Sequence, residues 1–146
     1  MSEILVIGET IDGTVEPVTY ELIAAARCLS ESSKGPVAVV FLGGALPDGI
    51  SADAVVHGAD KVYMVQHPLL SHANADIHLA SVQQVCSHSS PGVILFGKTD
   101  YARDIAPRLA YRLQTGLAQD SLAVVVAPDT GRVVATRPVY GGSAIA

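Results

Sequence analysis

Hydrophobic residues are grouped in short unbroken runs that end at glycines or polar turns. The runs ILVI, VAVVFL and VILF contain only apolar side chains, and each is followed closely by glycine. Such a run is typical of a parallel strand, because helices cover both faces of a parallel sheet and both faces of the strand are buried. The sequence predicts strands over residues 3–8, 37–42, 61–66, 92–97, 120–127 and 132–140.

Helical spacing of apolar residues fills the intervals between the strands. Leu22, Ala26 and Leu29 lie on one face of the first predicted helix, and Thr19 has a hydroxyl that can cap its N-terminus. The same reasoning predicts helices over residues 19–32, 51–57, 75–88 and 104–115.

The alternation of strands and helices predicts right-handed βαβ units and an α/β fold. We expect an open, mostly parallel, Rossmann-like sheet with strand order 3-2-1-4-5 and helices on both faces. The turn at residues 128–131 is too short for a crossover, so the last two strands should form an antiparallel hairpin. A length of 146 residues fits one α/β domain spanning residues 1–146.

Composition and charge exclude several classes of function. The net charge is −5 and the basic residues are scattered, so neither nucleic acid nor an anionic membrane surface is an expected partner. The apolar runs are too short to insert into a membrane, and the N-terminus has no secretion signal. Cys28 and Cys86 form no CxxC pair, so we expect free, buried thiols and a cytoplasmic location. The histidines lack metal-ligand spacing, and we expect all five on the surface.

In an open sheet of this kind, ligands bind where the strand order reverses, outside the carboxyl ends of the strands. That point lies here between the first and fourth strands, and its walls are loops 8–13 and 97–104. The second loop carries Lys98, Thr99 and Arg103 before a helix N-terminus, where a phosphate or a partner's carboxylate could bind. Alternatively, Asp104 caps the helix while both basic side chains are solvated. A start near Asp104 is expected because Pro107 is tolerated only near the beginning of a helix.

Complete catalytic motifs are missing from the sequence. The segment Gly8-Glu9-Thr10 is not the glycine fingerprint of a dinucleotide site, and neither a phosphate-binding P-loop nor a G-x-S-x-G elbow occurs. Glu9 and Asp12 could act as an acid–base pair, but solvated loop carboxylates are the more common case. We therefore expect no catalytic residues, no metal ligands and no enzyme activity from this chain alone.

Several segments together resemble a known family. LFGKT at 95–99, RDIAPRLA at 103–110, TGL at 115–117 and Asp120 are similar to the N-terminal domain of the electron transfer flavoprotein alpha subunit, and ILVI, GADKVY and TRPVYGG agree. Two positions depart from the pattern: Ala102 replaces a common glycine, and Ser143 stands where the family often has asparagine.

The resemblance implies a scaffold and docking domain of an electron carrier. Such a protein takes electrons from flavin dehydrogenases, such as the acyl-CoA dehydrogenases of fatty acid β-oxidation, and passes them to a quinone reductase or a similar acceptor. Its alpha subunit pairs with a beta subunit, and FAD is held mainly by a second, C-terminal domain. That domain is absent here, so we expect the first half of a longer protein, with no cofactor in this chain alone.

Two further expectations follow from the sequence and the resemblance. The candidate residues at the crevice or a partner interface are Thr99, Arg103, Asp104, Arg108, Arg137 and Tyr140. We also expect one apolar face that the beta subunit covers and through which the isolated chain self-associates.

An alternative function is a small module that binds an adenine nucleotide in the crevice.

Overall fold

Four parallel strands form the central sheet of the computed structural model, which describes residues 2–72, 74–119, 121 and 123–136 and the backbone of 138–139 and 144–145. The order is β5-β4-β1-β6, which confirms the predicted order 3-2-1-4. The strands are β1 (Ile4–Ile7), β4 (Val37–Gly43), β5 (Lys61–Gln66) and β6 (Val93–Leu95).

Helices cover both faces of this sheet, as the sequence predicts. One face carries α1 (Pro17–Ser33) and α2 (Ile50–Val56), and the other carries α3 (Ala75–Ser89) and α4 (Asp100–Arg112). Residues of β1 alternate between the two cores: Ile4 and Val6 pack with α1 and α2, whereas Leu5 and Ile7 pack with α3 and α4. This double burial explains the unbroken apolar runs. None of the helices in the described part of the chain is long and apolar enough to cross a membrane.

The first helix begins earlier than predicted. Pro17 takes its first position, where a missing N–H costs nothing, and Glu16 precedes it without a side-chain cap. Thr19 is therefore not the cap. It is buried inside the helix, and its Oγ1 accepts a hydrogen bond from the Glu9 N–H at 3.0 Å. This bond ties α1 to the loop that follows β1.

A small hairpin follows β1, where the sequence predicts a loop. It consists of β2 (Thr10–Ile11) and β3 (Thr14–Val15), which pair antiparallel around Asp12 and Gly13. Both turn residues have positive φ, 51° and 76°. An Asp-Gly pair favours this two-residue turn, so the sequence did contain a signal for the hairpin.

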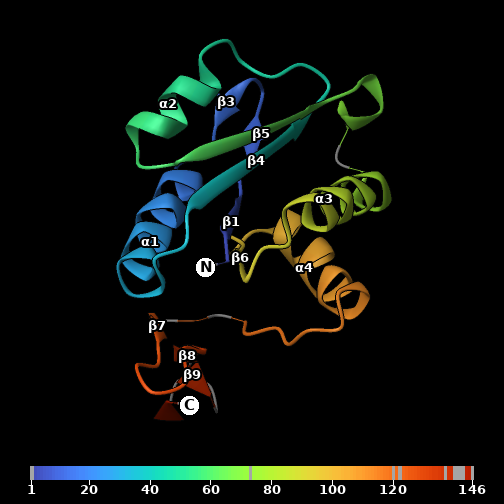
Figure 1. Cartoon of the computed structure of the whole chain (residues 1–146). Coiled ribbons are helices and arrows are strands. Elements are labelled where there is room, and N and C mark those ends of the chain that lie inside the picture. Colours follow the sequence, from blue (N-terminus) through green and yellow to red (C-terminus); the bar gives the residue numbers. More distant parts are fainter. Residues whose placement is uncertain are drawn as a thin grey trace.

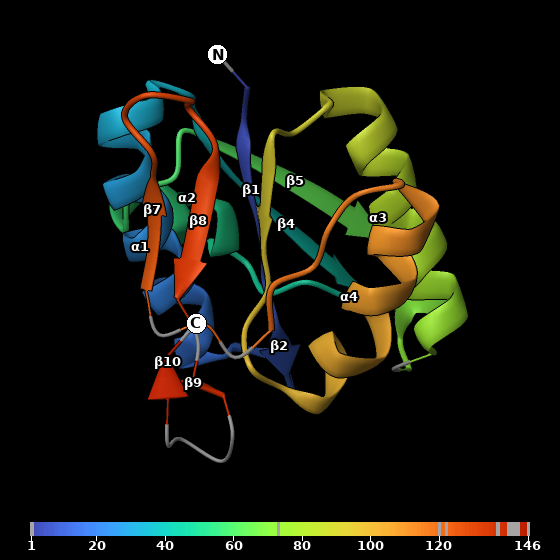
Figure 2. The ribbon, with the colours of Figure 1, turned by 90° about the horizontal axis from the view of Figure 1, so that it is seen from below.

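The C-terminal hairpin is confirmed, but it does not extend the parallel sheet. β7 (Ala123–Val126) pairs antiparallel with β8 (Val133–Thr136), and both are shorter than predicted. Val124 and Val126 pack against the core beneath α1. This burial keeps β7 next to α1, and β7 does not lie next to β6 (Figure 2). The remaining short elements are the 3-10 helix η1 (Pro68–Leu70), β9 (Pro138–Val139) and β10 (Ala144–Ile145).

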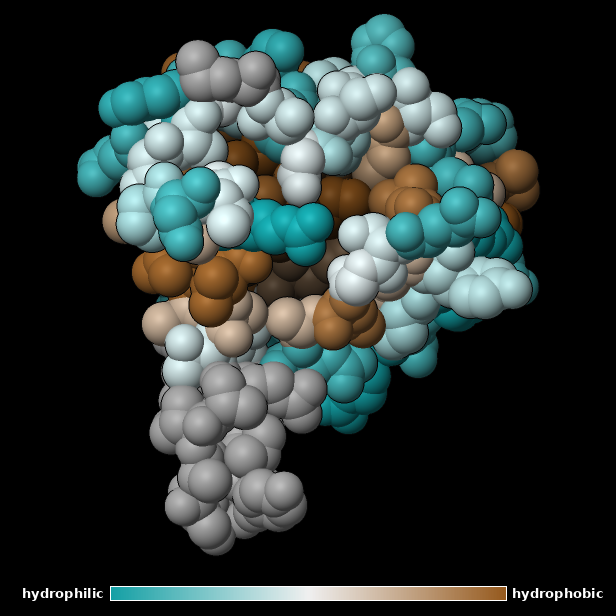
Figure 3. Space-filling model, turned by 60° about the horizontal axis from the view of Figure 1, so that its bottom comes forward, coloured by the Kyte–Doolittle hydropathy of each residue, from teal (hydrophilic) through white to brown (hydrophobic). Residues whose placement is uncertain are grey.

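Strand β6 consequently forms an edge of the described sheet. All three of its residues are only half-buried, although they belong to the cores on the two faces. On the underside of the molecule, Figure 3 shows a hollow with apolar side chains inside it and along its rim. β6 lies there between the β7–β8 hairpin and α4 (Figure 2).

Candidate functional site

The structure brings the two predicted crevice loops together at the carboxyl ends of β1 and β6. These strands are neighbours in the sheet, so the loops that follow them meet at one edge. The contact is direct, because the hydroxyl of Thr99 donates a hydrogen bond to Glu9 Oε2 at 2.9 Å. Glu9 and Thr99 therefore form the polar centre of the crevice.

Close packing leaves little room at this point for a bound ligand. A Cβ added to Gly97 would lie 2.7 Å from a methyl carbon of Val18 on α1. A Cβ added to Gly8 would lie 2.5 Å from the ring of Phe41 on β4. These glycines thus allow the protein's own side chains to approach, whereas the glycines of a dinucleotide site let a pyrophosphate approach.

The electrostatics of the crevice also disfavour an anion. Glu9 is half-buried, and this burial raises the pKa of its carboxyl group, as does the nearby Glu16, while the hydrogen bond from Thr99 opposes the rise. The carboxylate lies close to the start of α4, where the fold would otherwise bind a phosphate. An ionised Glu9 repels a phosphate, and in either charge state its hydrogen bond engages the Thr99 hydroxyl, so the residues present do not fit FAD or another dinucleotide at this point.

The cap of α4 is Thr99, and the expectation for Asp104 is wrong. Thr99 Oγ1 accepts a hydrogen bond from the Ala102 N–H at 3.1 Å, so the helix begins at Asp100. Asp104 is exposed within the helix, which also contains Pro107. A proline inside a helix costs about 3 kcal/mol. Burial of an apolar stripe against the sheet offsets this cost, and the stripe consists of Ala102, Ile105, Ala106 and Leu109.

Replacing Thr99 should reveal which residue caps the helix. We expect Thr99→Ala to lower the free energy of unfolding by about 0.5–2 kcal/mol, because an N–H of the first turn loses its acceptor. Thr99→Ser should retain most of the stability. Asp104→Ala should change it by less than about 0.5 kcal/mol, as is usual for an exposed position. Urea denaturation measures all three variants, and a larger loss from Asp104→Ala would refute this assignment.

The basic candidates on α4 differ in their surroundings. The side chain of Arg103 is 70% exposed, and it forms an ion pair with Asp100 one turn earlier, at 3.5 Å. Arg108 instead reaches α3, where it forms an ion pair with Asp76 and holds the pKa of that carboxyl group below its usual value. Arg112 also reaches α3 and donates to Gln83 Oε1 at 3.0 Å. Arg108 and Arg112 thus join two helices, and Arg103 faces solvent.

Two of the candidate residues cannot be placed. Arg137 and Tyr140 lie outside the described residues. Lys98 lies between Gly97 and Thr99, in the loop that connects β6 to α4. The structure therefore unites Thr99, Arg103, Asp104 and Arg108 on one helix and its cap.

His78 is a buried polar residue, although the sequence predicts a surface position for it. It is 6% exposed, and its Nε2 lies 3.2 Å from the carbonyl oxygen of His72. A carbonyl only accepts, so Nε2 carries the proton, and Nδ1 accepts from the Tyr101 hydroxyl at 2.7 Å. Helical spacing could have revealed the burial, because His78 precedes the buried Val82 by one turn. The other four histidines are exposed, as predicted.

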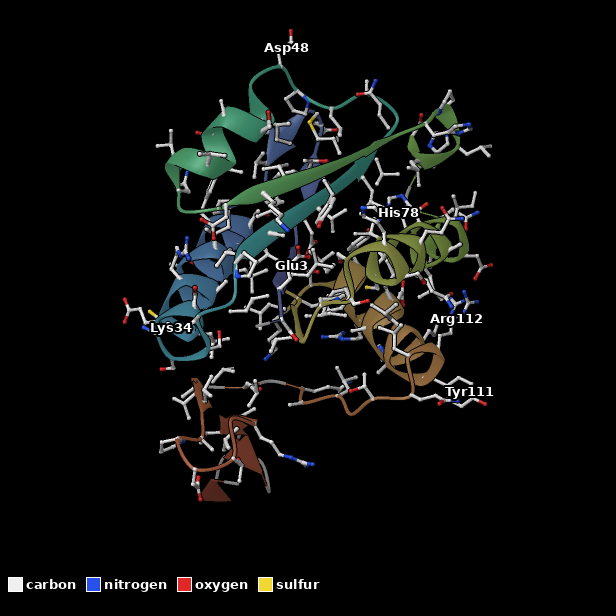
Figure 4. The ribbon with its side chains drawn as sticks, in the orientation of Figure 1. Glu3, Lys34, Asp48, His78, Tyr111 and Arg112 are labelled. Carbon is white, nitrogen blue, oxygen red and sulfur yellow. The ribbon has the colours of Figure 1, made fainter. Side chains whose placement is uncertain are left out.

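Glu3 is a second buried polar residue, at the amino end of the sheet and therefore opposite the crevice (Figure 4). Tyr63 donates its hydroxyl to Glu3 Oε2 at 2.9 Å, and the Lys61 ammonium lies 3.5 Å from the same oxygen. Glu3 Oε1 is buried without a hydrogen-bond partner among the described residues. The charge of Glu3 is thus partly compensated, as a buried carboxylate requires.

The cysteines are only partly as predicted. Cys86 is buried, which raises the pKa of its thiol to about 11 and keeps it protonated near neutral pH. Cys28 is a free thiol too, but it is exposed, contrary to the prediction. Across the described ranges, no group of three or more potential ligand side chains could hold a metal ion.

Comparison with known proteins agrees with the resemblance in the sequence. The model of the electron transfer flavoprotein domain matches residues 4–146. The chain is 38% identical over 142 residues to the electron transfer flavoprotein subunit alpha of Bacillus subtilis, covering 97% of this chain and 42% of that protein. It is 33% identical over 143 residues to the corresponding subunit of Megasphaera elsdenii, covering 98% and 42% of the two chains. Protein FixB of Azorhizobium caulinodans is 36% identical over 136 residues, with 90% and 36% covered.

These matches have a clear limit in length. The chain spans about two fifths of the length of the first two of these relatives, 42% in each case. Nevertheless, the family model extends over nearly the whole sequence, and the order of the four parallel strands is the one that the sequence predicts. The chain therefore belongs to the electron transfer flavoprotein domain family.

Proposed function

We propose that this chain is a scaffold and subunit-docking domain in the alpha subunit of an electron transfer flavoprotein. The observation that carries the proposal is the closed crevice, in which Glu9 and Thr99 bind each other at the point where related folds bind a ligand. A domain whose ligand position is filled by its own side chains contributes through the surfaces that it presents to partners. The relatives in Bacillus subtilis and Megasphaera elsdenii are electron transfer flavoprotein subunits, and they supply the context of electron transfer.

In this proposal, the beta subunit is the direct partner and the complex works in the cytoplasm. The complex carries electrons from flavin dehydrogenases to a quinone reductase or a similar acceptor, and this chain is not itself an enzyme. FAD belongs to the parent complex and is held mainly outside this chain. The lack of a fit between the crevice and a dinucleotide supports that division, since Glu9 would repel a phosphate.

The same geometry disfavours the alternative of an adenine-nucleotide module. A nucleotide phosphate would need to displace the Glu9–Thr99 hydrogen bond and approach a half-buried carboxylate. It would also need the space beside Gly97, which Val18 takes. Docking is therefore the function that this arrangement supports better.

Arg103 is the described residue best suited to test docking. Its guanidinium group is largely solvent-exposed and its partner Asp100 is almost fully exposed, so this pair adds little to folding. An arginine in that state can pair with a carboxylate of another subunit. Arg137 joins the test as the second candidate from the sequence.

The experiment replaces each arginine by alanine in a full-length alpha subunit and measures affinity for the beta subunit together with the melting temperature. We expect Arg103→Ala or Arg137→Ala to weaken binding about tenfold, equivalent to about 1.4 kcal/mol, with little change in melting temperature. Arg132→Ala is the matched control, because Arg132 is exposed on the turn between β7 and β8. Unchanged affinity in both test variants rejects the docking role, and a large loss of melting temperature would show a structural role instead.

A further inference from the structure

Strand β5 is an outer edge of the sheet and has β4 as its one strand neighbour in the described structure. Every second one of its six residues therefore points its backbone N–H and C=O groups outward, away from β4. Such an edge pairs readily with another strand unless charges, proline or a bulge protect it. β5 contains no proline, and its one charged residue, Lys61, stands at its first position.

Apolar side chains lie beside this edge. Met64 on β5 is 48% exposed, and on the adjoining helix α2 Val55 and Val56 are 54% and 83% exposed. A shallow hollow of about 440 Å³ lies between helix and strand, and its lining residues are Ser51, Ala52, Val55, Asp60, Lys61 and Val62. We name Val55, Val56, Val62 and Met64, together with the free edge of β5, the β5–α2 face.

The opposite edge of the sheet is not equally accessible. β6 lies in the hollow on the underside of the molecule, between the β7–β8 hairpin and α4 (Figures 2 and 3). A second sheet approaching that edge would collide with these flanking elements. β5 instead lies at the outer margin of the molecule, with α2 and η1 beside its ends (Figure 1). An intermolecular sheet can therefore form through β5.

We propose that the β5–α2 face binds a second copy of this chain, with the two β5 strands paired antiparallel in one continuous sheet. The face is complementary to itself under a two-fold axis perpendicular to the sheet. Val62 and Met64 align with Val39 and Phe41 of β4 and so lie on the face that α1 and α2 cover. The axis keeps that face on the same side in both copies, so these apolar side chains meet their counterparts.

Charge also favours antiparallel self-pairing. Lys61 begins the strand, so a two-fold axis near Tyr63 or Met64 places the two lysines at opposite ends of the joint, about 13–20 Å apart along the strand at 3.3 Å per residue. Opposite Lys61 is then Val65 or His67, and no two like charges face each other directly. The contact closes with two copies, since each copy uses the same surface. The exposed valines of the two α2 helices flank the joint on one side.

Sedimentation equilibrium of this chain over about 1–300 µM tests the proposal. We expect a reversible dimer for the natural sequence, and a monomer for Met64→Lys, which places two ammonium groups beside the axis. Val56→Glu should weaken dimerisation at least tenfold, and it lies on α2 outside the sheet, so it provides the test if Met64→Lys impairs folding. Tyr111→Lys is the control, because Tyr111 is 85% exposed at the end of α4, far from β5 (Figure 4).

Hydrogen exchange distinguishes strand pairing from other association. We expect the outward amides of β5 to exchange at least tenfold more slowly at dimer-forming concentrations, with no such change in α4. A monomer at every concentration, equal effects of Met64→Lys and Tyr111→Lys, or unchanged β5 amides would overturn the proposal. The test uses no beta subunit, so its failure leaves the docking function untouched, and loss of docking would not affect it.

Discussion

Replacing Ile105 by alanine should lower the free energy of unfolding by about 2–5 kcal/mol, the range measured for large-to-small changes in protein cores. Ile105 is fully buried in α4 and packs in the core between this helix, α3 and the sheet. Its removal leaves a cavity beneath the helix that carries Arg103. The total stability of a protein of this size is about 5–15 kcal/mol, so a loss of this size is a large fraction of it.

Graded and neighbouring substitutions identify the cause of that loss. Ile105→Val removes one methylene and should cost about 0.5–1.5 kcal/mol. Asp104→Ala changes the adjacent exposed residue and should stay within about 0.5 kcal/mol. Urea denaturation at neutral pH measures the series. Equal losses for Ile105→Ala and Asp104→Ala would contradict the assignment of the buried face of α4.

The success of the strand prediction has a simple physical origin. Strands covered on both faces need apolar residues at every position, and few other elements show short unbroken runs bounded by glycine. β1 and β4 follow this rule, because all their residues are buried. The order of the first four strands then follows from right-handed crossovers.

Helix starts were harder to predict because local rules compete with packing. Thr19 has the chemistry of a cap, but Pro17 before it already fits the first turn, and Thr19 is used to hold Glu9. Pro107 argues for a late start of α4, but Thr99 and the buried face beneath the helix favour an early one. In both helices, contacts between residues that are distant in the sequence determine where the helix begins. Rules based on neighbouring residues do not describe such contacts.

The position of the last hairpin likewise depends on tertiary contacts. The run of valines in β7 suits a strand buried on both faces, and so the sequence favoured a fifth place beside β6. In the structure, Val124 and Val126 bury one side against the core under α1, and Val125 stays 56% exposed. Pairing with β8 satisfies the backbone of β7 without β6.

The sequence predicted where the candidate site lies in the fold, but it did not predict the chemistry of that site. Topology alone indicated that the loops after the first and fourth strands meet. It gave no indication that Glu9 would turn inward and accept a hydrogen bond from Thr99, ninety positions away. Because of that contact, the protein's own side chains fill the position at which an anion could have bound. The chemistry of a crevice depends on side-chain directions, which spacing does not encode.

Asp60 should show the clearest pH-dependent contribution to stability. Its carboxylate lies at the amino end of the sheet and links the start of β5 to β4 and α1. Asp60 Oδ2 accepts a hydrogen bond from the Val37 N–H at 2.9 Å and lies 3.1 Å from Arg27 Nη1. The same Arg27 nitrogen also donates to the Gly58 carbonyl at 2.9 Å. The hydrogen bond from Val37 is the largest cause that lowers the pKa of Asp60 from its ordinary value of 3.8, and Arg27 adds to it.

A folded-state pKa below the unfolded value means that ionisation of Asp60 stabilises the fold. This contribution is fully present above the unfolded pKa near 3.8 and is lost as the pH falls through the lower folded value. Asp60→Asn keeps an acceptor for Val37 but removes the charge, and Asp60→Ala removes both. Because the carboxylate is 45% exposed, we expect about 1–2 kcal/mol of destabilisation for alanine at pH 7 and less for asparagine.

The measurement compares urea denaturation of the natural chain, Asp60→Asn and Asp60→Ala at pH 7 and at steps down to pH 2.5. The difference between the natural chain and Asp60→Asn should shrink as the pH falls below about 4, because the natural side chain then becomes neutral as well. Asp48→Asn provides the control, since Asp48 is an exposed aspartate in the loop after β4 and its replacement should change stability by less than about 0.5 kcal/mol. A difference that stays constant down to pH 2.5 would show that the charge of Asp60 does not act through Val37 and Arg27. The hydrogen bonds and packing of the Asp60 side chain, independent of its charge, would then account for its whole effect on stability.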